Sequence, residues 1–144
     1  MIHRNEDYRF EIGKAITLKE GTDVAIIACG SITANALKAA EMLKEKNISC
    51  TVVDMHTVKP LDEKAIDQLL DHKLLVTIEE HTIYGGLGSA VAEYLGPIPK
   101  KPPQLLLGVK GFFPHAGDYQ YLLEQCGLTT AQIADEIEQK FAAL

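Results

Sequence analysis

Residues 73–96 have the sequence KLLVTIEEHTIYGGLGSAVAEYLG, which combines a strand, a turn and a helix in one unit. The apolar run 74–78 is typical of a strand that is buried on both faces of a sheet, and it stops where the charged residues 79–81 begin. A glycine-rich turn, 85–89, predicts positive φ angles and leads into an amphipathic helix that ends at Gly96. The pattern indicates an α/β protein.

The end of this strand and the start of this helix are expected to meet at the carboxyl edge of a parallel sheet. Ligands usually bind at that edge in α/β proteins. The candidate ligand or anion site there consists of Glu79, Glu80, His81, Gly85, Gly86, Gly88 and Ser89. Two interpretations of the turn stay open. Its N–H groups can bind a phosphate, or its glycines can simply let the strand turn tightly into the helix. The second is favoured because neither G-x-G-x-x-G nor a Walker lysine is present.

Composition restricts the class of protein. The chain has 144 residues, of which 47% are hydrophobic and 24% charged, and this predicts one globular unit with a single core. A net charge of −6 argues against general affinity for nucleic acid, which needs clustered Lys and Arg. No apolar run approaches the roughly 20 residues of a membrane span, so no membrane partner is expected.

The cysteines and the N-terminus predict a cytoplasmic protein. Cys29, Cys50 and Cys126 are widely spaced and include no C-x-x-C, which favours reduced thiols over a disulfide or zinc framework. The first two lie in apolar runs and are interpreted as small core residues rather than nucleophiles. Residues 1–9 are polar and charged, so they are expected to form a lead-in and not a signal peptide.

Strands and helices alternate along the rest of the chain, which predicts a parallel sheet covered on both faces. The first strand, 10–18, alternates apolar and polar residues and has no helix after it, so it is expected to join antiparallel at an edge and to complete a five-stranded mixed sheet. The other strands are expected at 24–30, 49–56, 74–78 and 104–109. Helices are expected to begin with N-caps at Ser31, Asp62, Asp118 and Thr129, the last in a capping box with Gln132.

The residues at the strand ends have the types needed for two kinds of chemistry. Asp54, His56, Glu79 and His81 have the residue types of a metal site, but strand-end carboxylates and imidazoles more often bond each other or loop backbone, so a Glu–His contact is favoured and no metal is expected. Glu79, Glu80 and His81 are also general acid/base candidates, with a solvated or helix-capping cluster as the favoured interpretation. No nucleophile elbow is present, and no catalytic residue is assigned.

Three phrases carry a resemblance to a known family. The sequences VVDMHTVKPLDEKAI (52–66), LLVTIEEHTIYGGLGSAVAEYLG (74–96) and EQCGLTTAQIADEI (124–137) together resemble the C-terminal domain of the transketolase family of thiamine-diphosphate enzymes. The match covers residues 10–144, and its start at residues 10–15 looks like the entry to that domain in transketolases encoded as two separate subunits. Deoxyxylulose-phosphate synthases are close relatives with similar phrases. It implies a three-layer α/β/α domain whose five-stranded mixed sheet has its first strand antiparallel to the rest.

The resemblance also implies what lies elsewhere. Thiamine-diphosphate enzymes hold magnesium diphosphate with a Gly-Asp-Gly motif and an Asn, and Gly117-Asp118-Tyr119 is not such a motif. No cofactor is therefore expected in this chain. Thiamine diphosphate and magnesium are expected on upstream pyrimidine-type and diphosphate-type domains or subunits of a homodimeric parent that transfers ketol units between sugar phosphates. The domain alone is expected to be inactive and to serve assembly. A regulatory ligand-binding domain, a ligand-free interaction module and the same domain of a deoxyxylulose-phosphate synthase are the alternatives.

A candidate interface lies in the loop that contains Phe112, Phe113 and His115. Aromatic residues are common anchors at interfaces, and these lie outside the regular apolar stripes. The alternative is that both phenylalanines fold back and cover the end of the sheet. Family members often carry an Asp before the aromatic pair where this chain has Gly111, so the contacts of this loop are expected to differ.

Overall fold

The structure is a computed structural model that describes residues 10–144. The expected lead-in, residues 1–9, lies outside that range. The five strands form one sheet in the order β1-β3-β2-β4-β5, in which only β1 is antiparallel to its neighbour. The strands are β1 (Ile16–Lys19), β2 (Val24–Ala28), β3 (Cys50–Asp54), β4 (Leu74–Thr82) and β5 (Gln104–Val109).

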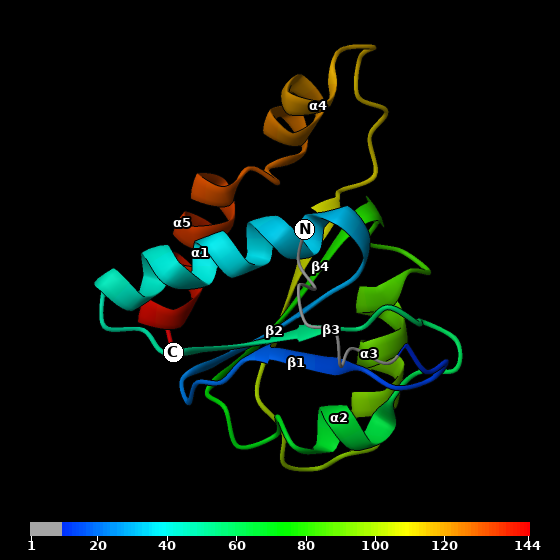
Figure 1. The fold of residues 1–144 in the computed structure, drawn as a ribbon, viewed down its shortest axis with the longest axis vertical. Helices are drawn as coiled ribbons and strands as arrows, with labels where there is room; N and C mark the ends of the chain where they lie inside the picture. The colour runs from blue at the N-terminus through cyan, green and yellow to red at the C-terminus, as the bar shows by residue number, and fades with distance from the viewer. Residues whose placement is uncertain (1–9) are drawn as a thin grey trace.

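Helices cover both faces of this sheet (Figure 1). They are η1 (Gly30–Ile32), α1 (Thr33–Glu45), α2 (Glu63–Asp67), α3 (Leu87–Leu95), α4 (Tyr119–Cys126) and α5 (Thr130–Ala142). Helices α1 and α5 pack on one face, and α2 and α3 pack on the other. Successive side chains of a strand point to opposite faces, so a strand between two helical layers must be apolar at every position. Strand β2 meets this demand, since all five of its residues are buried. The predicted three-layer fold is confirmed.

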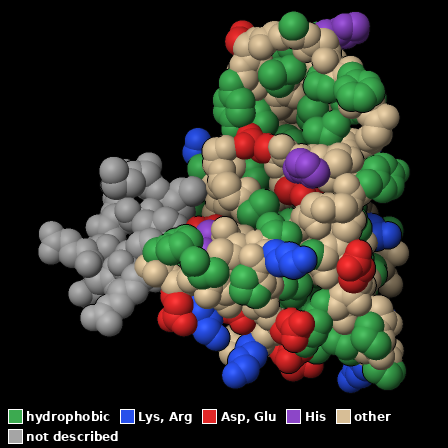
Figure 2. Space-filling model, turned by 90° about the vertical axis from the view of Figure 1, so that its right-hand side faces the viewer, with side chains coloured by type: hydrophobic (Ala, Val, Ile, Leu, Met, Phe, Trp, Pro, Cys, Tyr) green, Lys and Arg blue, Asp and Glu red, His purple; other side chains and the backbone are tan. Residues whose placement is uncertain are grey.

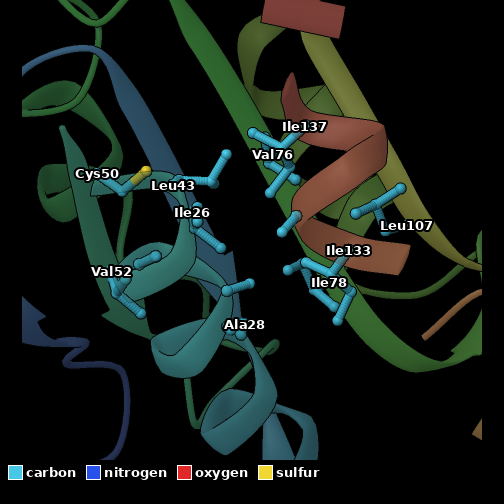
Figure 3. Packing of buried hydrophobic residues seen from close by; sticks show 14 of the residues in the cluster. Ile26, Ala28, Leu43, Cys50, Val52, Val76, Ile78, Leu107, Ile133 and Ile137 are labelled. Atoms are coloured by element: carbon cyan, nitrogen blue, oxygen red, sulfur yellow. The ribbon is translucent and has the colours of Figure 1, made fainter. Parts of the chain in front are cut away.

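The core has one cluster on each side of the sheet. On the α1 and α5 side, alternate residues of β2 and β4 such as Ile26 and Val76 meet Leu43 of α1 and Ile133 of α5 (Figure 3). On the other side, Ile27 and Leu75 belong to the cluster that includes Val91 of α3. Full burial of each such aliphatic side chain contributes roughly 1.5–3 kcal/mol before conformational entropy is counted.

The first strand is shorter than the sequence predicts. The alternating pattern of 10–18 predicts a strand over its whole length, yet β1 begins only at Ile16. Gly13 has a φ of +80° in a turn. The backbone N–H groups of Gly13 and Ala15 donate to the side chains of Thr57 and Asp62, both at 2.9 Å. These residues therefore bond the loop after β3 instead of a neighbouring strand.

The expected N-cap at Ser31 is wrong. Residues 30–32 form the short 3₁₀ helix η1, and α1 begins at Thr33 without a side-chain cap. The Ser31 hydroxyl donates instead to the Glu80 carboxylate, which comes from the neighbouring strand β4. Polar side chains at helix starts have competing partners in a folded protein, and here the partner far along the chain is the one bonded.

The other three predicted N-caps are confirmed. Asp62 and Asp118 accept hydrogen bonds from the backbone N–H groups of Ala65 and Tyr121. Gly127 ends α4 in the left-handed conformation at φ +72°. Thr129 and Gln132 form a capping box. Within residues 10–144, no helix combines the length and the apolar character needed to cross a bilayer.

Candidate functional site

Strand β4 runs further than the sequence predicts. The prediction ends the strand at Ile78 because charge begins at Glu79, but β4 continues to Thr82. Ile78 pairs with Leu107 and Thr82 with Val109, so four steps along β4 match two steps along β5 and the register shifts between them. Alternation along β4 puts Glu79 on the same face as Leu75, which packs in the cluster that includes α3. Glu79 is only 3% exposed, whereas Glu80 and His81 are exposed.

The buried carboxylate of Glu79 caps helix α3. Its two oxygens accept hydrogen bonds from the backbone N–H groups of Leu87 and Gly88, each at 2.8 Å. The first N–H groups of a helix have no partner within the helix, and the helix dipole favours negative charge there. Glu79 thus occupies the position at which a bound phosphate is expected. The favoured helix-capping interpretation of this acidic cluster describes Glu79.

The glycines of the turn have different reasons for being glycine. Gly85 has a φ of +80° and open space around it. Gly86 and Gly88 do not have positive φ, so that explanation is wrong for these two. A Cβ at Gly86 would overlap the Glu79 carboxyl group, whose Cδ would be only 2.8 Å away. A Cβ at Gly88 would lie 2.9 Å from Leu106 Cδ2. The close approach of the Glu79 carboxylate explains the glycine at position 86, and the close approach of strand β5 explains the glycine at position 88.

Ser89 also has partners within the turn. Its hydroxyl accepts from the Gly85 N–H at 2.8 Å and donates to the Ile83 carbonyl at 3.0 Å. The sequence placed Glu79, Gly86, Gly88 and Ser89 in one site, and the structure does bring them together. Their contacts hold the β4–α3 turn, while binding of an external anion there stays a prediction.

Glu80 lies near the carboxyl end of β4, next to the place where the order of the strands in the sheet reverses. Strand β2 is followed by β3 on one side, and β4 returns to its other side, so the carboxyl ends of β2 and β4 flank the crevice in which α/β proteins usually bind ligands. Glu80 accepts hydrogen bonds from the hydroxyls of Ser31, after β2, and Tyr119, in α4. The bond to Glu80 raises the pKa of Tyr119. Sequence reasoning missed Ser31 and Tyr119 as partners because they are far from Glu80 in the chain.

The strand-end residues that have the types of a metal site make separate contacts. The expected Glu–His contact is a long one, because His81 Nδ1 lies 3.9 Å from Glu79 Oε2, beyond hydrogen-bond distance, and 3.0 Å from the carbonyl oxygen of Thr82. His56 lies instead against the ring of Phe10, with centroids 4.3 Å apart. Among residues 10–144, no group of three or more His, Cys, Asp or Glu is arranged to hold a metal ion. Burial raises the pKa of the Cys29 thiol to about 11, which leaves it a weak nucleophile.

The loop after β5 presents its aromatic residues to solvent. Phe113 is 101% exposed, whereas Phe112 is 42% exposed and lines a pocket with Thr82 and Val109, which end β4 and β5. His115 is exposed too, and the ring of Tyr84, from the turn after β4, would lie 3.6 Å from a Cβ at Gly111. The carboxyl end of strand β3 points to the right in Figure 1. Figure 2 views the molecule from that right-hand side, and hydrophobic side chains gather at the upper end of this face.

Fold and site together define a doubly covered α/β domain whose carboxyl edge is bonded internally and bordered by exposed aromatic residues. Residues 13–133 match the family model described as "Transketolase, C-terminal domain". The chain belongs to this family, as its resemblance predicts. The family is found in both transketolases and deoxyxylulose-phosphate synthases.

Individual relatives are longer than this chain. A Methanocaldococcus jannaschii protein, provisionally named a transketolase C-terminal section, is 40% identical over 97% of this chain and 44% of its own length. The 1-deoxy-D-xylulose-5-phosphate synthase of Thiobacillus denitrificans is 43% identical over 93% of this chain and 21% of its own. A solved structure described as "Split gene transketolase, inactive beta4 tetramer" superimposes with a TM-score of 0.90 at 39% identity. The match covers 99% of this chain and 46% of the chain in that structure. This chain therefore spans less than half of each of these proteins.

Proposed function

We propose that this chain is the non-catalytic C-terminal domain of a thiamine-diphosphate-dependent transketolase, which transfers ketol units between sugar phosphates, and that it serves assembly of the enzyme. The observation that carries this proposal is the Glu79 carboxylate on the N–H groups of Leu87 and Gly88. The helix N-terminus most suited to a phosphate is used to hold the domain together, while the large aromatic side chains of Tyr84 and Phe113 are exposed at the same edge. That combination favours protein contacts over chemistry.

The residues described do not fit thiamine diphosphate. A diphosphate needs free N–H donors or a metal, and the donors at the start of α3 are already bonded to Glu79. No group of acidic side chains within residues 10–144 is placed to hold magnesium. We therefore assign both groups to other domains or subunits of the parent, of pyrimidine and diphosphate type. Free thiols at Cys29, Cys50 and Cys126 fit the proposed cytoplasmic location.

The position at which the chain enters the domain supports contacts at the carboxyl edge. Strand β1 is antiparallel, and its first residue, Ile16, pairs with Asp54 at the carboxyl end of β3. The segment before β1 therefore lies on this edge, where Phe10 and Ile12 are 59% and 69% exposed. Phe112 and Phe113 follow the carboxyl end of β5. Upstream domains joined through this segment would meet these apolar groups.

The similar split-gene transketolase supports an assembly role as well. Its structure is described as an inactive "beta4" tetramer. The chain in that structure is more than twice as long as the part that matches this chain. By analogy, we infer that this chain alone lacks activity and forms contacts with other protein chains. A homodimeric parent is part of this proposal.

Titration calorimetry with magnesium thiamine diphosphate tests the proposal. The chain alone is expected to give no saturable heat, and no ketol transfer from ketose phosphates is expected in a parallel assay. A dissociation constant of about 1 μM would correspond to about 8 kcal/mol of binding and would require a formed pocket. Such a result, or turnover by the isolated chain, would overturn the assignment.

Phe113→Ser is expected to weaken assembly with little effect on folding. Phe113 is fully exposed, so its removal should change the free energy of unfolding by no more than about 0.5 kcal/mol. As an aromatic anchor in an interface, it should contribute at least tenfold to association of the parent subunits, measured by sedimentation. Met42→Ser, which alters a 37% exposed apolar residue of α1, is the matched control and should leave association unchanged. Equal association of both variants would remove Phe113 from the interface.

A second candidate function is the same role in a deoxyxylulose-phosphate synthase. This chain is 43% identical to the deoxyxylulose-phosphate synthase of Thiobacillus denitrificans and 40% identical to the Methanocaldococcus jannaschii protein. The two identities support the two candidates about equally. The two parents differ in the product that they form. Product analysis of the assembled parent, by mass spectrometry, separates them without any change to the role proposed for this domain.

A further inference from the structure

Helix α4 covers a cavity of about 260 Å³ at the carboxyl ends of β4 and β5. Its walls are almost entirely apolar. They are formed by Val109, Pro114, Leu122, Leu123, Cys126 and Leu128, with Glu80 and Tyr119 as the polar contributors. Pockets that bind small molecules are usually mostly apolar, with a few polar groups that fix the orientation of the ligand. This cavity is separate from the α3 N-terminus, which Glu79 occupies.

The polar end of the cavity has a single charge sign. Glu80 is exposed, and each of its oxygens accepts one hydroxyl hydrogen bond, from Tyr119 and from Ser31. A carboxylate has about four acceptor positions, so Glu80 can accept further donors while both hydroxyls stay in place. The bonds from both sides fix the carboxylate beside the apolar walls. Lys110 directly follows Val109 of the cavity lining, and its ammonium group forms an ion pair with Glu136.

We propose that this cavity binds a small primary amine in its ammonium form, with an aromatic or branched aliphatic body. The ammonium group donates to Glu80, and the body lies against Val109, Leu122 and Cys126. A carboxylate or phosphate of the same shape is disfavoured, because it would place a second negative charge beside Glu80. This inference concerns an additional site and does not depend on the proposed assembly function.

Titration of the ¹⁵N-labelled chain with phenethylammonium, followed by NMR, tests the proposal. Saturable shifts are expected in the amides of residues 109–128, with a dissociation constant of about 1 mM or tighter, as the small size of the probe allows. 3-Phenylpropionate has the same ring and opposite charge and is expected to bind at least tenfold more weakly. Ammonium chloride, which lacks the body, is expected to give no saturable shift. Equal binding of the two aromatic probes would overturn the proposal even if no variant were made.

Variants separate the two parts of the site. Glu80→Gln keeps hydrogen-bonding groups and removes the charge, so it is expected to weaken phenethylammonium binding at least tenfold. Glu93→Gln, an exposed carboxylate of α3 outside the cavity lining, is the control and should bind as the wild type does. Cys126→Phe puts a ring into the cavity and is expected to abolish binding. Unchanged affinity in Glu80→Gln, or shifts that saturate only at residues outside the cavity, would contradict the assignment.

Discussion

Gly86→Ala is expected to lower the free energy of unfolding by roughly 3 kcal/mol or more, measured from urea melts. The added methyl group alone would overlap the Glu79 carboxyl group, and the neighbour it meets is a buried charge with fixed partners. Relief of that overlap must move Glu79 off the N–H groups of Leu87 and Gly88. An overpacked site typically costs 1–3 kcal/mol, and an unsatisfied buried donor costs about 1–3 kcal/mol more.

Gly85→Ala is the matched control for backbone strain. Gly85 has positive φ and nothing within 4 Å of an added Cβ, so alanine there should cost only the conformational penalty, about 1–2 kcal/mol. Gly86→Val should then resemble Gly86→Ala, since the overlap begins at the Cβ. A Gly86→Ala melt with the midpoint of the wild type would show that Glu79 does not need this close approach.

Glu79→Ala is expected to cost roughly 2–5 kcal/mol of stability. Its removal leaves the N–H groups of Leu87 and Gly88 buried without a partner, and it leaves a void beneath the turn. Glu79→Gln should lose less, because one amide oxygen can still accept. Glu80→Ala changes an exposed neighbour and should lose no more than about 1 kcal/mol. Equal midpoints for the Glu79 and Glu80 variants would contradict the helix-capping role.

Much of the fold follows from patterns that are local in sequence. The apolar runs predict all four parallel strands because buried strands leave no freedom in residue type, and β5 begins and ends at the predicted residues. Caps at Asp62, Asp118 and Thr129 are predicted correctly because side chain and target lie within one turn. The same local logic makes the antiparallel edge strand predictable in direction.

The errors arise where a distant partner changes a local preference. Ser31 has a good N-cap side chain, yet it bonds Glu80, 49 residues away. Phe10–Ala15 alternates like a strand, yet Thr57 and Asp62 take its backbone donors. Glu79 marks the end of a strand by charge alone, but β4 continues past it, and alternation puts its side chain on the same face as Leu75, where the N-terminus of α3 offsets its burial. The spacing of residues within one segment cannot predict these contacts, because the partners are far apart in the sequence.

The sequence therefore predicts which of these residues lie together better than it predicts the contacts that they make. The sequence brings Glu79, Gly86, Gly88 and Ser89 to one edge, because the topology of a parallel sheet requires it. Whether the glycines serve an external phosphate or an internal carboxylate depends on the direction of the Glu79 side chain, and a prediction that ends the strand at Ile78 does not give that direction. The aromatic loop at Phe112 and Phe113 was ambiguous for a related reason, since loop residues have no periodic pattern.

The central claim, that the chain's own Glu79 fills the anion position at the start of α3, is tested most directly by an NMR titration with inorganic phosphate. The amide signals of Leu87 and Gly88 report on that position in the intact chain. We expect neither to shift in a saturable way up to about 10 mM phosphate at pH 7, since a phosphate would have to displace a buried carboxylate that is part of the fold. Saturable shifts of both amides in the wild-type chain, with a dissociation constant of about 1 mM or tighter, would show that the position is open to ligands and would contradict the account.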